Sequence, residues 1–142
     1  MVAMIVVINP WSNPARAYEE FEPTGTFSSL IVDDDPLGPG DLTGYEIVVK
    51  KTDTGYTGTF RVAEGGIPDF ITIEPVIENG MISFTIVEKS YRLGKKSITK
   101  FIGFYDEKGI SGTISTEKGR ILYQVNNLWR LPHKGIWTGS GQ

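Results

Sequence analysis

Residues 55–63 have the sequence GYTGTFRVA, and this stretch carries the clearest strand pattern in the chain. From Tyr56 to Val62, aromatic, glycine and aliphatic residues occupy every second position, and polar residues stand between them. Successive side chains of a strand point to opposite faces of a sheet. The alternation therefore predicts a strand with one dry face and one face in water.

The same period of two recurs from Thr24 onward and predicts eight strands, at residues 24–32, 43–51, 55–63, 70–77, 81–87, 97–105, 109–115 and 120–131. Most connections are short and end in a glycine, such as Gly55, Gly80 and Gly119, which suits hairpin turns. Two connections, at 33–42 and 88–96, are longer. Pro75 cannot donate a ladder hydrogen bond, so the fourth strand is expected to bend, bulge or lie at an edge there.

Hairpins between sequential strands predict an antiparallel meander, and closure into a barrel would remove its exposed edges. We therefore predict an all-β domain over residues 18–133, a single meander of about eight strands closed into a small barrel. Its inward aromatic residues are Tyr45, Tyr56, Phe60, Phe84, Tyr123 and Trp129. Gly58 and Gly112 lie on the same face, where they either leave a cavity or let the sheet coil sharply around a filled interior.

This pattern resembles the calycins, that is, the lipocalins and their relatives, and is similar to small secreted bacterial lipocalin-like domains. Lipocalins carry a G-x-W motif at the first strand, and a basic residue near the last strand packs over the tryptophan. Here the triplet is Gly25-Thr26-Phe27, with phenylalanine in place of tryptophan, and Arg130 lies in the last predicted strand. The resemblance implies a barrel with a pocket for a small ligand and implies no catalytic residues.

Composition restricts the partners and chemistry of this 142-residue chain. Its net charge of −3 disfavours nucleic acid, because phosphate recognition needs a surplus of basic residues. There are no cysteines, which excludes disulfides and thiolate metal sites. No apolar run approaches the roughly 20 residues that a membrane-spanning helix needs.

The N-terminal residues combine a short apolar run at 2–8 with an A-x-A triplet at Ala15-Arg16-Ala17. Small residues at those two positions fit a signal peptidase, so we predict a secretory signal at 1–17 and a periplasmic or secreted protein. No basic residue precedes Ile8, which departs from the usual signal. The alternative is an additional strand in a cytoplasmic protein.

Residues that could perform catalysis are few. His133 is the one histidine and follows the last predicted strand; no nucleophile motif, phosphate loop or metal motif accompanies it. Asp33-Asp34-Asp35 with Asp41 forms an acidic turn that lacks EF-hand spacing, so it is read as a solvated turn. We predict no catalytic residue, metal or cofactor.

Two binding functions and one enzymatic function remain as hypotheses. The first is a barrel that holds a small apolar ligand among its inward aromatic residues. The second is a protein-interaction module, such as an inhibitor or an envelope-associated protein, that works through its loops, in particular through the basic residues Arg92, Lys95 and Lys96. An enzyme is the least favoured. Residues 134–142 are predicted to be a flexible tail.

Overall fold

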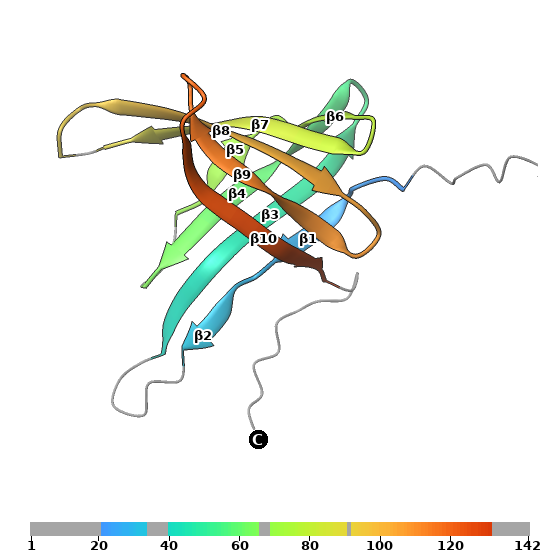
Figure 1. The fold of residues 1–142 in the computed structure, drawn as a ribbon, viewed down its shortest axis with the longest axis horizontal. Helices are drawn as coiled ribbons and strands as arrows, with labels where there is room; N and C mark the ends of the chain where they lie inside the picture. The colour runs from blue at the N-terminus through green and yellow to red at the C-terminus, as the bar shows by residue number, and fades with distance from the viewer. Residues whose placement is uncertain (1–20, 34–39, 66–68, 91, 132–142) are drawn as a thin grey trace, which may run out of the picture.

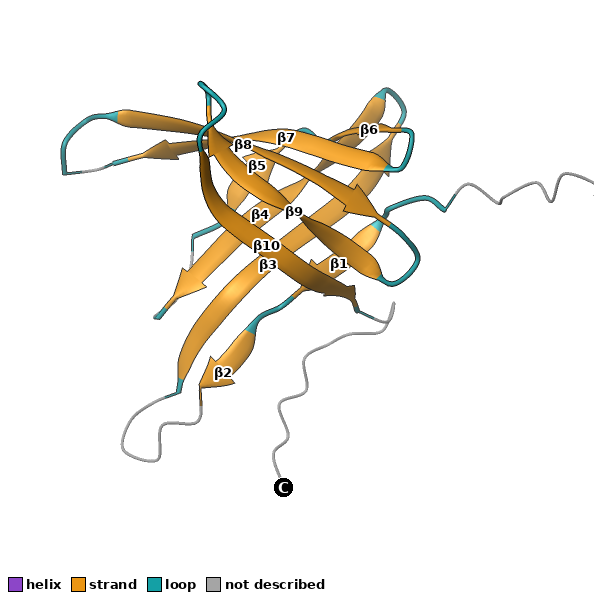
Figure 2. Ribbon diagram, in the orientation of Figure 1, coloured by secondary structure: helices purple, strands orange, loops and turns teal. Residues whose placement is uncertain are grey.

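The computed structural model describes residues 21–33, 40–65, 69–90 and 92–131 (Figures 1 and 2). The predicted signal at 1–17, the tail at 134–142, His133 and the acidic pair Asp34-Asp35 lie outside these residues. All regular elements among the described residues are strands: β1 (Gly25–Ser28), β2 (Ile31–Asp33), β3 (Asp41–Thr52), β4 (Gly55–Glu64), β5 (Ile71–Ile73), β6 (Val76–Glu78), β7 (Met81–Lys89), β8 (Lys96–Tyr105), β9 (Gly109–Thr116) and β10 (Ile121–Arg130).

The ten strands form one antiparallel sheet in the order β5-β4-β3-β1-β10-β9-β8-β7-β6, with β2 paired beside β1 on β3. The predicted all-β antiparallel meander is thus confirmed.

The hairpin turns contain the glycine and polar residues that the sequence predicted there. Asn79 and Gly80 adopt φ values of 51° and 75° between β6 and β7. In the turn between β8 and β9, the Asp106 carboxylate accepts hydrogen bonds from the backbone N–H groups of Lys108 and Gly109.

The predicted closed eight-stranded barrel is wrong, because the sheet is a strongly curled half-barrel that stays open. Its ends are β5 and β6, which follow each other in sequence across Glu74-Pro75. β5 pairs with β4 and β6 pairs with β7, but no ladder joins β5 to β7, although the two strands lie close to each other. Pro75 has no N–H to continue a ladder, so the predicted interruption at this residue is confirmed.

The higher strand count arises because two of the predicted strands are interrupted. The first predicted strand divides into β1 and β2, and the fourth divides into β5 and β6. We name the stretch of β7 that follows its pairing with β6, residues 84–89, the open edge. On its other side β7 pairs with β8 along its whole length.

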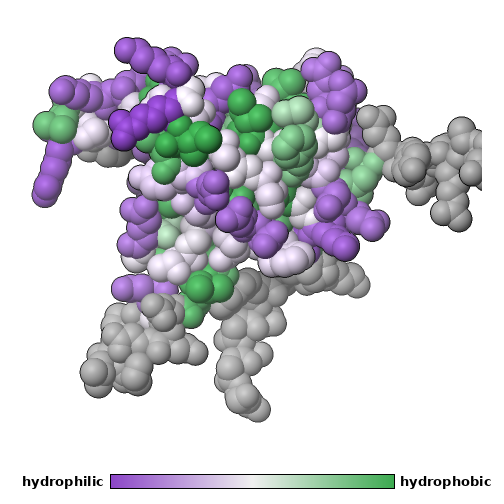
Figure 3. All heavy atoms as spheres, in the orientation of Figure 1, coloured by the Kyte–Doolittle hydropathy of each residue, from purple (hydrophilic) through white to green (hydrophobic). Residues whose placement is uncertain are grey.

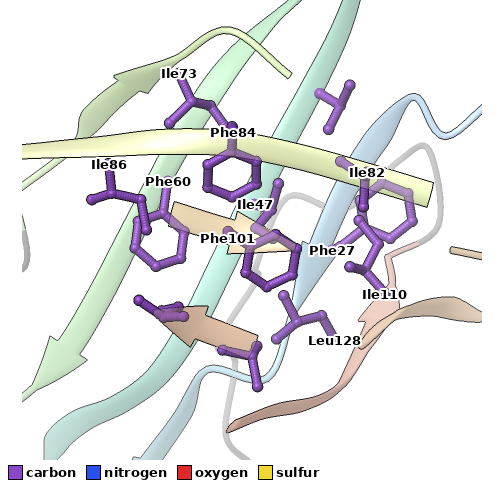
Figure 4. Packing of buried hydrophobic residues seen from close by; sticks show 13 residues of the cluster. Phe27, Ile47, Phe60, Ile73, Ile82, Phe84, Ile86, Phe101, Ile110 and Leu128 are labelled. Carbon is purple, nitrogen blue, oxygen red and sulfur yellow. The ribbon is translucent and has the colours of Figure 1, made fainter. Parts of the chain in front are cut away.

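Aromatic rings fill the middle of the half-barrel (Figure 4). The Phe84 ring lies 4.8 Å from that of Phe101 and 5.7 Å from that of Phe60, centroid to centroid. A Cβ added at Gly112 would lie 2.7 Å from the Phe101 ring, and one at Gly58 would collide with the carbonyl oxygen of Val48. Both glycines therefore permit close approach of neighbouring groups, which supports the sharply coiled sheet around a filled middle.

A bulge in β10 changes which residues face inward. The pairing of β10 with β9 shifts between Val125 and Leu128, and both of these side chains are fully buried. Asn127 takes φ 51° within the bulge, and its N–H donates to Ser111 Oγ at 3.0 Å. The extra residue reverses the alternation, so Trp129 is 57% exposed. The prediction that Trp129 lies on the inner face is therefore wrong.

Candidate ligand-binding cavity

A cavity of about 470 Å³ lies at the end of the half-barrel where β4 ends and β7 continues toward its hairpin with β8. Phe60, Ile86 and Ile114 form its buried floor. Tyr45 and Tyr123 belong to its walls; Tyr45 is half-buried and Tyr123 is 53% exposed. The cavity is therefore apolar at its base and carries phenol groups nearer the solvent.

Three of the six predicted ligand-binding residues meet at this cavity. Tyr45, Phe60 and Tyr123 come from β3, β4 and β10 and all line it. The Tyr45 and Phe60 rings are stacked with centroids 6.3 Å apart and an interplanar angle of 23°. Phe84 lies beneath them in the filled middle, against Phe60. The curl of the sheet brings these strands together.

Tyr45 is the residue whose ionisation the cavity perturbs. Burial raises the pKa of the Tyr45 phenol above its ordinary value, and the negative charges of Glu64 and ionised Tyr123 raise it further. The phenol therefore stays neutral at physiological pH. Tyr45, Glu64 and Tyr123 all line this cavity, which accounts for the effect of the two negative charges on the phenol.

Tyr56 lies in a different cluster, with Glu22 and Lys51, away from the cavity. The Tyr56 hydroxyl donates to Glu22 Oε1 at 3.3 Å, and Lys51 forms an ion pair with the same carboxylate. Hydrogen bonding to Lys51 is the main cause of the lowered pKa of Glu22. Ile77 and Tyr105 also line this region, so the cluster covers the end of the interior where β6 meets β7.

Arg130 packs over a different ring from the one that the lipocalin resemblance implied. Its guanidinium lies 4.8 Å from the centroid of the Phe21 ring and donates to the Thr24 carbonyl oxygen at 3.1 Å. Phe27 is fully buried in the core and pairs with Arg130 through the backbone. The arginine thus ties the last strand to the chain segment that precedes β1.

Trp129 lies on the outer face, where it lines a groove of about 250 Å³ together with Phe104. Phe104 is 67% exposed. Figure 3 shows apolar side chains on the viewed face as separate small groups among polar ones, with no continuous patch. Isolated exposed apolar residues are normal on soluble proteins.

The predicted interaction residues Arg92, Lys95 and Lys96 are exposed at the hairpin between β7 and β8. This hairpin projects from the body of the sheet (Figure 1). Backbone hydrogen bonds from Ser90 N to Lys95 O and from Gly94 N to Ser90 O shape the turn. The three side chains lie on a projecting element, and none of them lines the cavity.

Among the cavity residues that the sequence did not single out are the two carboxylates, Glu64 and Glu88. Each continues the inward face of its strand by one more step of two, after Val62 in β4 and after Ile86 in β7. The signal was therefore present in the alternation. It was overlooked because a charged residue at the end of an apolar series is normally taken as the end of the strand.

No protein-family model matches the chain, and no match was found among curated proteins or solved structures. Across the residues that the structure describes, no three histidine, cysteine or acidic side chains gather where they could hold a metal ion. Those residues also contain no helix with the length and apolar character needed to cross a membrane.

Proposed function

We propose that this protein is a non-enzymatic binding protein that holds a small, largely apolar ligand in the end cavity. The observation that supports the proposal is the convergence of Tyr45, Phe60 and Tyr123 on a space of about 470 Å³. Ligand pockets typically measure about 300–1,000 Å³ and combine apolar walls with a few polar groups. Because aromatic rings fill the middle, the ligand occupies the end of the half-barrel, as in a shallow lipocalin-like cup.

The chemistry of the walls favours binding over catalysis. The described lining consists of apolar, hydroxyl and carboxylate side chains with Gly65, and it includes no histidine, lysine or cysteine. Such walls offer contact area from the aromatic rings and hydrogen bonds from the rim.

Titration with N-phenyl-1-naphthylamine, a neutral apolar dye whose fluorescence rises in apolar sites, tests this function. We expect saturable binding that the Tyr123→Ala variant weakens about tenfold, since truncation removes roughly 1–2 kcal/mol of aromatic contact. Trp129→Ala is the matched control, because it removes a similarly exposed ring of the same strand outside the cavity. Lack of saturable binding, or equal weakening by both variants, would overturn the proposal.

A second candidate function is protein interaction through the β7–β8 hairpin, favoured by the exposed Arg92, Lys95 and Lys96 on a projecting element. Partner capture from a periplasmic extract by the Lys95→Glu/Lys96→Glu double variant tests it. If the hairpin binds a partner, the double variant should no longer capture it. The Lys118→Glu variant, which changes an exposed lysine of the β9–β10 turn, should still capture it. Unchanged capture by the double variant rules the hairpin out.

A further inference from the structure

Two carboxylates line the end cavity from different strands. Glu64 is the last residue of β4, and Glu88 lies near the end of β7. On each strand the carboxylate follows the residues that build the apolar part of the cavity, Phe60 and Val62 on one side and Ile86 on the other. A ligand that rests on the floor would therefore have these carboxylates near its solvent-facing end.

Neither carboxylate is neutralised by a basic side chain in the described parts of the chain. The ion pairs found there join Lys51 to Glu22 and Arg61 to Glu46. Lys89 and Lys96 neighbour the cavity residues Glu88 and Ser97 in sequence, but strand alternation directs them to the opposite face. Lys89 lines an adjacent cavity beside the open edge, which Glu88 and Ser97 also border, and it forms no ion pair with Glu88. The described cavity lining contains two acidic residues and no basic one.

Aromatic rings stand next to these carboxylates. Tyr45 stacks on Phe60, and it lines the same cavity as Glu64 and Tyr123. The faces of aromatic rings attract cations, and recognition of amines and quaternary ammonium groups commonly combines such rings with carboxylates. An anionic head group at the same place would instead be repelled by the two carboxylates.

We propose that the ligand of the end cavity is an amphiphilic cation, an apolar chain or ring that bears an amine or quaternary ammonium group, with Glu64 and Glu88 as the residues that select its charge. This inference rests on the proposed binding function and adds the charge of the ligand to it. Fatty acids and other apolar anions are disfavoured by the same residues.

Three ligands with the same ten-carbon chain separate charge selection from apolar binding: decyltrimethylammonium, decanol and decanoate. Each competes with N-phenyl-1-naphthylamine below its micellar concentration, and circular dichroism confirms that the fold is retained. We expect decyltrimethylammonium to bind at least tenfold more tightly than decanoate, with decanol between them. The preference should shrink as salt is raised, because the carboxylates lie at the solvent-facing end.

Charge-neutral variants assign the preference to the two residues. Glu64→Gln/Glu88→Gln should abolish the difference between the cation and the anion while leaving decanol binding within about twofold of the wild type. Glu78→Gln/Glu107→Gln, which removes two exposed charges beside the β6–β7 and β8–β9 turns at the opposite end of the half-barrel, should leave the preference intact and so excludes an effect of net charge alone.

The outcomes separate the two proposals. Binding of decanol without a preference for the cation, or a preference that survives in Glu64→Gln/Glu88→Gln, overturns the charge selection and leaves the apolar binding function standing. Failure of all three ligands to displace the dye, or of the dye to bind, overturns both.

Discussion

The pKa of the Tyr45 phenol depends on the charges at the solvent-facing end of the cavity. This pKa is raised because of burial first and of Glu64 and Tyr123 second. Since the folded pKa is above the unfolded value, the neutral phenol stabilises the fold. This contribution is complete below the unfolded pKa of about 10 and is lost as pH rises through the folded pKa.

The Glu64→Gln variant should lower the pKa of Tyr45 toward its ordinary value, because the substitution removes a nearby negative charge. NMR titration of protein labelled with ¹³C at the tyrosine ζ carbon measures this shift. Glu74→Gln serves as the control, because it removes an exposed charge from the connection between β5 and β6. An unchanged Tyr45 titration in Glu64→Gln would mean that the carboxylate does not face the phenol.

The glycine at position 58 is predicted to be required for steric reasons. A Cβ at Gly58 meets the backbone of Val48 on the paired strand, which cannot move without breaking the β3–β4 ladder. Gly58→Ala should destabilise the protein by about 3 kcal/mol in urea unfolding, at the upper end of overpacking costs. Gly119→Ala, in open space at φ +85°, should cost only about 1 kcal/mol. Equal losses in the two variants would contradict the steric explanation.

At the level of elements, alternation located the stretches of chain that form the sheet, but it did not show that two of them divide into two strands each or that β10 contains a bulge. Val125 and Trp129 keep the odd-numbered apolar series, and Leu128 is out of phase with it. A single apolar residue out of phase is weak evidence in a sequence. In the structure Leu128 is fully buried and Trp129 is turned outward, because Asn127 adds one residue to the strand.

Deletion of Asn127 should therefore be far more damaging than its substitution. Without the extra residue, Leu128 turns to solvent and the Trp129 ring is forced inward, and we expect a loss of about 3 kcal/mol or more. Asn127→Gly should be nearly neutral, because glycine accepts positive φ and retains the N–H that Ser111 accepts. Urea unfolding of both variants checks this, and a mild effect of the deletion would show that the bulge does not set the register.

On the scale of the whole molecule, closure was the part of the fold that the sequence could not decide. Pro75 indicated a break in the fourth strand, but it did not indicate whether neighbouring strands would still meet beside it. That outcome depends on the curl of the complete sheet, which is set by close approaches such as those at Gly58 and Gly112. The candidate site depended on the same curl, since it brings Tyr45, Phe60 and Tyr123 together and leaves Tyr56 in another cluster.

Amide hydrogen exchange rates should distinguish the open edge from the part of β7 that pairs with both neighbours. Beyond its pairing with β6, β7 has a hydrogen-bonded neighbour on one side, β8. Amides of residues 85–89 should therefore alternate between slow and fast exchange, while those paired to both neighbours at residues 81–83 should all be slow. Amide exchange followed by NMR measures the pattern. Uniform protection along β7 would show that another strand pairs there.

The pairing of β1 with β10 has a consequence for the route by which the chain folds. In the strand order, this ladder joins the half of the sheet built from β1 to β5 to the half built from β6 to β10. All other ladders connect strands that are near in sequence, so each half can assemble locally as a series of hairpins. Phe27 must then meet Arg130 from almost the opposite end of the chain. Closing so long a loop is entropically costly, and we expect it to be the slow, final event of folding.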